Sequence, residues 1–167
     1  NNFALELSIR NWALNGIVNA SFEPKFSDLF IHLEPTYKGS YSIIVSNPPT
    51  FPGEAIHKND RNSWEMSGND GRVVLDAMLQ KSKDWLTDDG VMVVIATSKQ
   101  GHKKTTQLLN ENWKSWKIVH KEDVPLASFY FPYITLWLEK GKTEGEERVF
   151  KKGNDWFQTL YFIEARK

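Results

Sequence analysis

The sequence predicts an α/β fold built on an open sheet. Two nearly continuous apolar runs, at residues 41–46 and 91–96, are typical of strands that are covered on both faces, as in parallel sheets. A well-patterned helix is predicted over 72–86, between these runs, and a second helix over 101–112. Strand, helix, strand and helix in order, followed by two closing strands, indicate an open α/β sheet. In such sheets ligands bind at the carboxyl ends of the strands.

The remaining elements are predicted from local patterns. Apolar residues at helical spacing predict a helix over 3–14, and weak alternation predicts a strand over 19–26 that ends beside Asp28. Residues 50–70 are long, irregular and polar, and loops of that length are usually functional lids or disordered. The other expected elements are a connector at 32–40, a turn at 88–90, and strands at 116–121, 129–139 and 156–165.

The bulk composition excludes several classes of function. A chain of 167 residues is one domain by length, so we expect a single domain over 1–167. Its formal net charge is zero, which gives no global attraction to nucleic acid or to an anionic membrane but leaves room for a local basic patch. The absence of cysteine excludes disulfides, thiolate zinc sites and cysteine nucleophiles. No apolar run is long enough to span a membrane and no signal peptide is visible, so we expect a cytoplasmic protein without a membrane partner.

The motif Ser46-Asn47-Pro48-Pro49-Thr50 is the most informative feature of the chain. It directly follows the apolar run 41–45. Neither proline has an N–H group, so neither can continue the ladder of a sheet, and each pushes the preceding residue toward extended geometry. The sequence therefore predicts a rigid loop at a strand end, with the Asn47 amide and the next backbone carbonyls available to a ligand.

Such a corner suits a nitrogen that is about to be alkylated. An amide or aniline-type nitrogen is a poor nucleophile, because its lone pair is delocalised. The Asn47 side-chain oxygen and the Pro48 carbonyl can accept from both N–H groups of one planar –NH2, which favours rehybridisation at the transition state. We therefore predict Asn47, Pro48 and Pro49 as catalytic residues. The alternative is that the two prolines only stop a strand.

Other candidate groups are weaker. A small basic cluster at a strand end contains Lys99, His102, Lys103 and Lys104. Its two interpretations are a phosphate contact and a solvated face, and the second is the more common. The four histidines lack the spacing of metal ligands, so no metal site is predicted. The segment Ser67–Gly71 is expected either to form a hinge near the site or to cap the following helix through Asn69 or Asp70.

With the Asn-Pro-Pro corner in place, the chain resembles the class I S-adenosylmethionine-dependent N-methyltransferases, and among them the release-factor glutamine methyltransferases. The resemblance runs over about residues 1–113. Its other matches are Asn2–Ile17 as a helix, Ser27–Phe30 as the acidic end of a strand, Ser67–Gly71 as the glycine-bearing segment before a helix, and Gly90–Ala96 as the fifth strand.

The resemblance implies a Rossmann-like sheet that is mostly parallel with an antiparallel closing strand, and S-adenosylmethionine as cofactor. It implies that Asp28 accepts from the adenine amino group, that Leu29 flanks the adenine and that Asn47 also contacts the cofactor. Thr50 and Phe51 follow the motif at the position that contacts the substrate in this family.

The chain departs from the family in two places. The Gly-rich cofactor loop after the first strand is not in this sequence, so the first strands are expected to be absent and a missing N-terminal segment or a partner chain is expected. Without those strands, two edges of the sheet would be exposed. Thr50 also stands where the family has an aromatic ring that stacks on the flat acceptor group, and Phe51 or another aromatic residue within 50–70 is the expected substitute.

The resemblance implies methyl transfer to a planar nitrogen. A protein glutamine side chain, on a translation factor or ribosomal protein, is the leading acceptor, and an RNA or DNA base (guanine N2 or adenine N6) is the alternative. A non-catalytic methyltransferase-like subunit that binds a partner also stays open, because the Gly-rich loop is missing.

Overall fold

The computed structural model describes residues 2–18, 20–53 and 66–167, and it divides the chain into two compact units. The first unit covers residues 1–37 and the second covers 38–167. Each unit is described by itself, and the expectation of one domain over 1–167 stays a prediction.

The first unit contains one helix, α1, at Asn2–Leu14, which confirms the helix expected over 3–14. Its Trp12 ring stacks on Phe22 with the ring centroids 5.0 Å apart. The strand expected over 19–26 is wrong for the described residues 20–26, which form no strand. Pro24 cannot donate to a ladder, and no described segment of this unit pairs with these residues. The connector contains a short 3-10 helix, η1, at Pro35–Tyr37.

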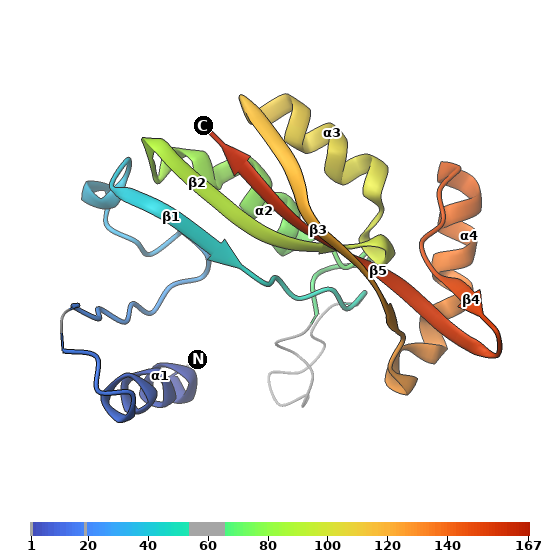
Figure 1. Cartoon of the computed structure of the whole chain (residues 1–167), viewed down its shortest axis with the longest axis horizontal. Coiled ribbons are helices and arrows are strands. Elements are labelled where there is room, and N and C mark those ends of the chain that lie inside the picture. Colours follow the sequence, from blue (N-terminus) through green and yellow to red (C-terminus); the bar gives the residue numbers. More distant parts are fainter. Residues whose placement is uncertain (1, 19, 54–65) are drawn as a thin grey trace. The chain divides into compact units, whose positions relative to one another are not determined.

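The second unit is built on a mixed sheet with the strand order β1-β2-β5-β3 (Figure 1). Strand β1, Tyr41–Ser46, pairs in parallel with β2, Leu86–Thr97. Strand β5, Asp155–Arg166, is antiparallel to β2, to β3 at Ser115–Pro125, and to the short β4 at Phe150–Lys152. The expected α/β class is confirmed. Among the described strands, β1 and β2 form the parallel pairing, and the pairings of β5 with β2, β3 and β4 form the antiparallel closing part of the sheet.

Strand β2 is longer than the sequence suggested. The turn expected at 88–90 is wrong, because these residues lie inside β2 as an irregularity of its pairing with β1. The register moves from Tyr41 opposite Leu86 to Ile43 opposite Val91. A Cβ atom on Gly90 would lie 2.9 Å from the Thr87 carbonyl oxygen, so this bulge requires glycine.

Two helices pack on one face of the sheet. They are α2 at Val73–Lys81 and α3 at His102–Asn112, joined to the strands by the 3-10 turns η2 at Ser82–Asp84 and η3 at Ser98–Gln100 (Figure 1). Leucines of both helices, together with Met92, Val94 and Ile163 of the strands, form the main core. The helix expected over 72–86 thus ends earlier, and Leu86 begins β2.

The strand expected over 129–139 is wrong. These residues form a 3-10 segment, η4, at Ser128–Tyr133, and the helix α4 at Ile134–Glu144. Alternating aromatic residues imitate a strand here, but Pro132 interrupts any ladder, and Trp137 and Gly141 are buried one helical turn apart. Trp137 packs with Leu126 and Val149 in a second, smaller core that also holds Tyr130 and Tyr133.

The described part of the chain contains no helix that is both long and apolar enough to cross a membrane. Strand β1 lies at the end of the described strand order, with β2 as its described partner. The side chains of Ile43 and Val45 on β1 are 53% and 70% exposed.

Candidate active site at the Asn-Pro-Pro corner

The Asn-Pro-Pro motif lies where the sequence places it. Strand β1 ends at Ser46, and residues 47–50 continue without regular structure. Pro48 is buried and anchors the corner, while Asn47 is exposed and Pro49 and Thr50 are half-buried. The prolines end the ladder, so the polar atoms of Asn47 stand beyond the edge of the hydrogen-bonded sheet.

A cavity of about 430 Å³ opens at this corner. It lies across the carboxyl ends of β1 and β2 and the beginning of the antiparallel β5, which is the edge at which ligands bind in open α/β sheets. The lining residues are Asn47, Pro48, Pro49, Thr50, Ile95, Thr97, Lys99, Tyr130, Gln158 and Leu160.

A buried lysine forms part of the cavity wall. Lys99 is 1% exposed and its ammonium lies 3.4 Å from the centre of the Tyr130 ring and 5.3 Å from that of Trp137. Aromatic faces attract a cation, most strongly when it is desolvated. The ammonium also donates to Thr50 Oγ1 at 3.3 Å, and Thr50 Oγ1 lies 3.4 Å from the Tyr130 hydroxyl. The expectation that Lys99 belongs to a solvated face is therefore wrong.

Phe51 lies behind the cavity wall. It is 4% exposed and stacks on Tyr130 at 4.8 Å between ring centroids, with Tyr133 edge-on at 5.0 Å. It is not among the residues that line the cavity, whereas Tyr130 is. The ring beside Thr50 in the wall is therefore Tyr130, from η4, and Phe51 supports it from the core.

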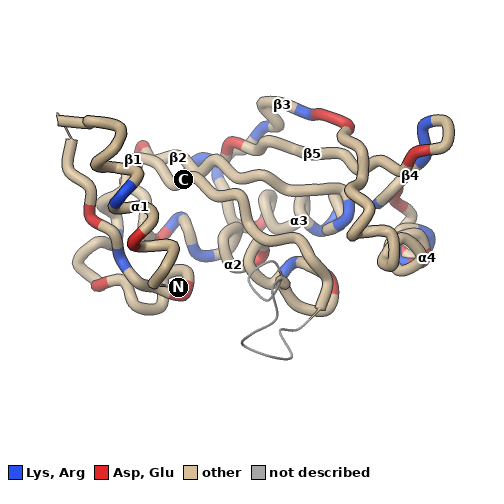
Figure 2. The backbone as a smooth tube through the Cα atoms, turned by 90° about the horizontal axis from the view of Figure 1, so that it is seen from below, with Lys and Arg blue, Asp and Glu red and all other residues tan. Residues whose placement is uncertain are grey.

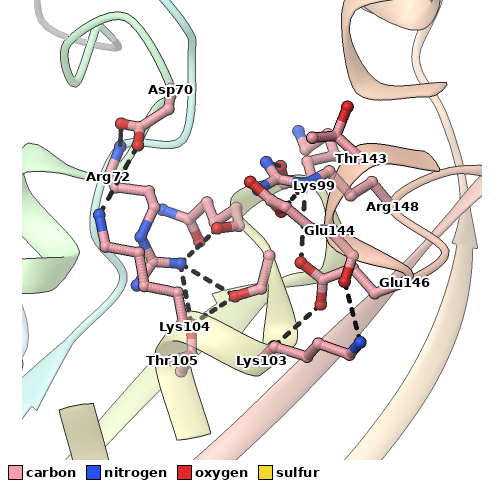
Figure 3. Close-up of polar contacts among 12 residues, drawn as sticks. Asp70, Arg72, Lys99, Lys103, Lys104, Thr105, Thr143, Glu144, Glu146 and Arg148 are labelled. Carbon is pink, nitrogen blue, oxygen red and sulfur yellow. Dashed lines mark hydrogen bonds and ion pairs between the residues drawn. The ribbon is translucent and has the colours of Figure 1, made fainter. Parts of the chain in front are cut away.

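Two buried arginines fix the turn that carries Lys99 (Figure 3). Arg72, at the start of α2, donates to the carbonyls of Gln100 and Gly101, the latter at 2.9 Å, and pairs with Asp76. Arg148 donates to the Lys99 carbonyl at 2.7 Å and pairs with Glu144. Because both guanidinium groups are almost completely buried, the backbone of η3 is held from two sides.

The segment Ser67–Gly71 adjoins the motif. Ser67 N donates to the Phe51 carbonyl at 2.9 Å, and Gly53 N donates to the Gly68 carbonyl at 2.8 Å. A Cβ atom on Gly71 would collide with the Thr50 carbonyl, so glycine allows this close approach. The segment also caps α2, through Ser67 Oγ on the Val74 amide and Asp70 Oδ1 on the Arg72 amide. The expected capping through Asp70 is confirmed, Asn69 makes no described cap, and the hinge stays a prediction.

Asp28 and Leu29 lie in the first unit. Leu29 has a φ of 51° and is the one residue other than glycine with positive φ in the described part of the chain. Ile31 N donates to the Asp28 carbonyl at 3.0 Å, and His32 N donates to Ser27 Oγ at 3.1 Å, so a hydrogen-bonded turn holds this conformation. Their contact with a cofactor stays a prediction, as do the roles predicted for the motif residues.

The sequence analysis did not predict six of the wall residues as site residues: Ile95, Thr97, Lys99, Tyr130, Gln158 and Leu160. Lys99 does follow a strand end, which was the available signal. Tyr130 and Gln158 come from distant segments, and their local patterns carry no sign of a site. Within residues 2–18, 20–53 and 66–167, the structure has no group of three or more His, Cys, Asp or Glu side chains that could hold a metal ion.

Comparison with known proteins finds two relatives that are named for methylation of nitrogen. A candidate protein N5-glutamine methyltransferase of Methanocaldococcus jannaschii is 32% identical over 111 residues, which are 65% of this chain and 53% of that protein. A tRNA1(Val) (adenine(37)-N6)-methyltransferase of Yersinia enterocolitica is 28% identical over 108 residues, 64% of this chain and 42% of that protein. The chain thus spans about half the length of the curated relatives it matches.

Two further comparisons add little. No protein-family model matches the chain. The solved Mtq2–Trm112 complex of E. cuniculi, named as responsible for methylation of the eRF1 translation termination factor, is 18% identical with a TM-score of 0.42, covering 78% of this chain and 54% of that chain. A likeness of this size is too small to carry an argument.

The two sequence relatives define the class. The chain is a relative of S-adenosylmethionine-dependent N-methyltransferases, and the resemblance drawn from the Asn-Pro-Pro corner is confirmed. More particularly, one relative is named for a glutamine amide and the other for an adenine amine, which are the two kinds of planar nitrogen that the corner suggested.

Proposed function

We propose that the protein transfers a methyl group from S-adenosylmethionine to a planar amide or exocyclic amino nitrogen, with a protein glutamine as the leading acceptor. The observation that carries this proposal is the cavity of about 430 Å³ at the Asn-Pro-Pro corner. Had side chains filled that corner, no acceptor nitrogen could reach Asn47.

In this proposal the chain supplies positioning. When bound, S-adenosylmethionine supplies a sulfonium methyl group, whose bond to sulfur breaks as the bond to nitrogen forms. The Asn47 side-chain oxygen and the Pro48 carbonyl accept from the two N–H groups of the acceptor, and Pro49 keeps the corner rigid. These contacts assist the reaction to the extent that they strengthen as the nitrogen becomes tetrahedral and cationic, before it releases one proton.

The residues proposed to contact the cofactor are Asn47, Asp28 and Leu29. Asn47 lines the cavity, which fits a ligand at that corner. Asp28 has an exposed carboxylate suited to accept from the adenine amino group, and the half-buried Leu29 is suited to flank the ring. In this proposal Tyr130 takes the place beside the acceptor that was expected for Phe51, because Tyr130 lines the cavity. It does so as a wall residue and not as a stacking face, since its ring already carries Lys99 and Phe51.

The charge distribution favours a protein acceptor over RNA. The net charge is zero, and basic segments alternate with acidic ones along the described backbone (Figure 2). A nucleic-acid-binding surface usually carries a basic stripe or patch. The adenine-N6 relative keeps a base as the second candidate acceptor. A translation factor or ribosomal protein as partner, and a cytoplasmic location, remain parts of the proposal.

The test uses the full-length protein in two measurements. Calorimetry with S-adenosylhomocysteine measures cofactor binding, and labelled methyl transfer is measured to total protein and total RNA from cells that lack the gene. Mass spectrometry of the digested products should identify N5-methylglutamine. Methylated adenine or guanine would move the assignment to the second acceptor. If the protein shows neither a heat of S-adenosylhomocysteine binding nor methyl transfer, the proposed enzymatic function is contradicted and a non-catalytic binding subunit is favoured.

A further inference from the structure

Gln158 presents an unpartnered polar group to the cavity. It lies near the start of β5 and is 8% exposed, and its Oε1 atom is buried without a hydrogen-bond partner in the described structure. Gln158 is also one of the residues that line the cavity at the Asn-Pro-Pro corner. Buried side-chain oxygens are nearly always hydrogen-bonded, so a buried one without a partner requires an explanation.

We propose that Gln158 determines acceptor specificity, by accepting a hydrogen bond from an N–H group of a glutamine residue bound in this cavity. The inference rests on the proposed function and names a second contact for the same acceptor. A bound glutamine carries N–H groups on its side-chain amide and on its main chain. Asn47 and Pro48 accept from the two side-chain N–H groups, so the main-chain N–H would give Gln158 Oε1 the partner that the described chain does not supply.

The sheet places Gln158 across the cavity from the motif. In the strand order β1-β2-β5, one strand separates Asn47 from Gln158, and that strand contributes Ile95 and Thr97 to the wall between them. Two strand spacings amount to about 10 Å across the sheet. Ser46 lies opposite Val94 and Thr97 lies opposite Leu160, so Gln158 also lies several residues further along the strand direction than Asn47. The two side chains can therefore hold different parts of one glutamine residue, with Asn47 at its side-chain amide and Gln158 at its main-chain N–H.

The walls favour an aliphatic amide over a nucleobase. Enzymes that act on a flipped base hold it by stacking between aromatic or apolar side chains. Tyr130 is the one aromatic residue among the described lining residues, and its ring is already covered by the Lys99 ammonium and stacked against Phe51. By contrast, the methylenes of a glutamine side chain can lie against Ile95 and Leu160, both of which are half-buried in the wall.

The nearest polar neighbours of the cavity do not replace this role. Thr50 Oγ1 already receives the Lys99 ammonium and contacts the Tyr130 hydroxyl. Lys99 has only donors to offer, and an N–H group of the acceptor needs an oxygen. Thr97 Oγ1 is also a wall oxygen, but its side chain caps the turn η3. Asn47 is already assigned to the side-chain amide, so Gln158 Oε1 is the wall atom best suited to receive the main-chain N–H.

The test compares two substitutions of Gln158 in the full-length protein. Gln158→Leu keeps the approximate size and removes the oxygen, whereas Gln158→Glu keeps an acceptor oxygen in a cavity whose wall also contains Lys99. With the total-protein pool as acceptor, we expect Gln158→Leu to raise the apparent KM by roughly 10- to 100-fold, the range for one lost hydrogen bond in a buried site. Gln158→Glu should stay within about tenfold of the parent protein, because the oxygen is kept.

The controls separate binding from folding. Both variants should bind S-adenosylhomocysteine like the parent protein and show a kcat within about threefold of it, since the lost contact is one of acceptor binding. Thr159→Val is the matched control, because Thr159 is the adjacent buried residue of β5 and its hydroxyl donates to Asp123 at 2.8 Å instead of lining the cavity. It should lower the unfolding midpoint without raising KM.

Each outcome decides between the two proposals. If the parent protein methylates glutamine and Gln158→Leu leaves KM unchanged, or if Leu and Glu weaken binding equally, the role of Gln158 is wrong and the proposed function stands. If the parent methylates only RNA, the amide specificity is wrong. If the parent transfers no methyl group and binds no S-adenosylhomocysteine, the proposed function itself is wrong.

Discussion

At the scale of single residues, Asn47 combines a fixed backbone with an accessible side chain. The strand before it and the buried Pro48 after it hold its backbone, while its side chain is exposed at the cavity. We expect Asn47→Ala to lower kcat by roughly 100-fold, the typical effect of losing one preorganised polar contact. The rate at saturating acceptor and cofactor measures this.

The control for Asn47 is Ser42→Ala, an exposed change on the strand that precedes it. Both variants should keep the unfolding midpoint of the parent protein, because neither side chain is buried. A rate for Asn47→Ala within threefold of the parent would contradict the assignment and favour a purely structural strand stop.

Thr50 is the residue at which the chain departs from the family it resembles. Its hydroxyl lies 3.3 Å from the Lys99 ammonium and 3.4 Å from the Tyr130 hydroxyl, so the space for a ring is already occupied. We therefore expect Thr50→Phe, although it restores the family's aromatic residue, to destabilise the fold by about 1–3 kcal/mol through overpacking and to lower kcat/KM.

Thr50→Val serves as the shape-matched comparison. It keeps the volume and loses the hydroxyl, so its cost should be about 0.5–1.5 kcal/mol. Urea unfolding and initial rates measure both variants. Higher activity for Thr50→Phe than for the parent would mean that the wall opens to accept a second ring, contrary to this arrangement.

At the scale of elements, the turn η3 depends on two buried guanidinium groups. Arg148 bonds the Lys99 carbonyl and pairs with Glu144 and, at 3.7 Å, with Glu146, whose side chain is 10% exposed. Truncation leaves a buried carbonyl and a nearly buried carboxylate without their cation. We expect Arg148→Ala to destabilise the protein by about 3–5 kcal/mol, as when one partner of a buried ion pair is removed.

The matched control is Arg166→Ala. Arg166 also pairs with a glutamate, Glu164, at 3.0 Å, but its side chain is 54% exposed. An exposed pair contributes about 0–1 kcal/mol, so the two arginine variants should differ severalfold in their effect on the free energy of unfolding. Similar losses from both would show that burial of Arg148 does not matter.

Sequence patterns predicted those elements whose signal is local. Apolar runs predict the strands β1 and β2, and two residues without N–H groups predict the end of β1. The pattern failed over 129–139, where alternating aromatic residues belong to a 3-10 segment and a helix that pack Trp137 into a separate core. The structure of this segment depends on packing of its aromatic residues into the second core. Alternation of residue types in the sequence does not reveal that packing.

The candidate site likewise has a part that the sequence predicts and a part that it does not. Residues 47–50 are contiguous, so their chemistry was readable from the sequence. Tyr130 and Gln158 reach the same cavity from segments 80 and more residues further along the chain than Thr50. Only the strand order β1-β2-β5 and the packing of η4 bring them there. A single sequence contains no spacing rule for such contacts.

At the scale of the whole molecule, net charge is zero and the pH dependence of stability depends on particular groups. His102 begins α3 and stacks on Tyr161 with ring centroids 4.4 Å apart, and its Nδ1 atom is buried without a partner. Burial lowers the pKa of His102 below its usual 6.5, and the charge of Lys121 acts in the same direction, while Glu146 opposes them. The folded protein therefore resists protonation at this residue.

The sign of the effect follows from proton linkage. Above the pKa of an unfolded histidine, near 6.5, His102 is neutral in both states and contributes nothing to the pH dependence. As the pH falls below that value, the unfolded chain takes up a proton that the folded chain does not, so stability declines until the lowered folded pKa is reached. Asp123 is stabilised in its charged form by Thr159 and Lys152, which lowers its pKa from 3.8, so its contribution is lost only at more acidic pH.

We therefore expect the free energy of unfolding to fall between pH 7.5 and pH 5.5, and His102→Phe to remove most of that slope. Phenylalanine keeps a ring against Tyr161 and cannot take up a proton. Urea unfolding of both proteins at pH 7.5, 6.5 and 5.5 measures the slopes, and the acid-induced loss below pH 4 should remain in the variant, because the carboxylates are untouched. An unchanged slope in His102→Phe would assign the pH dependence to another group and leave His102 as a packing residue alone.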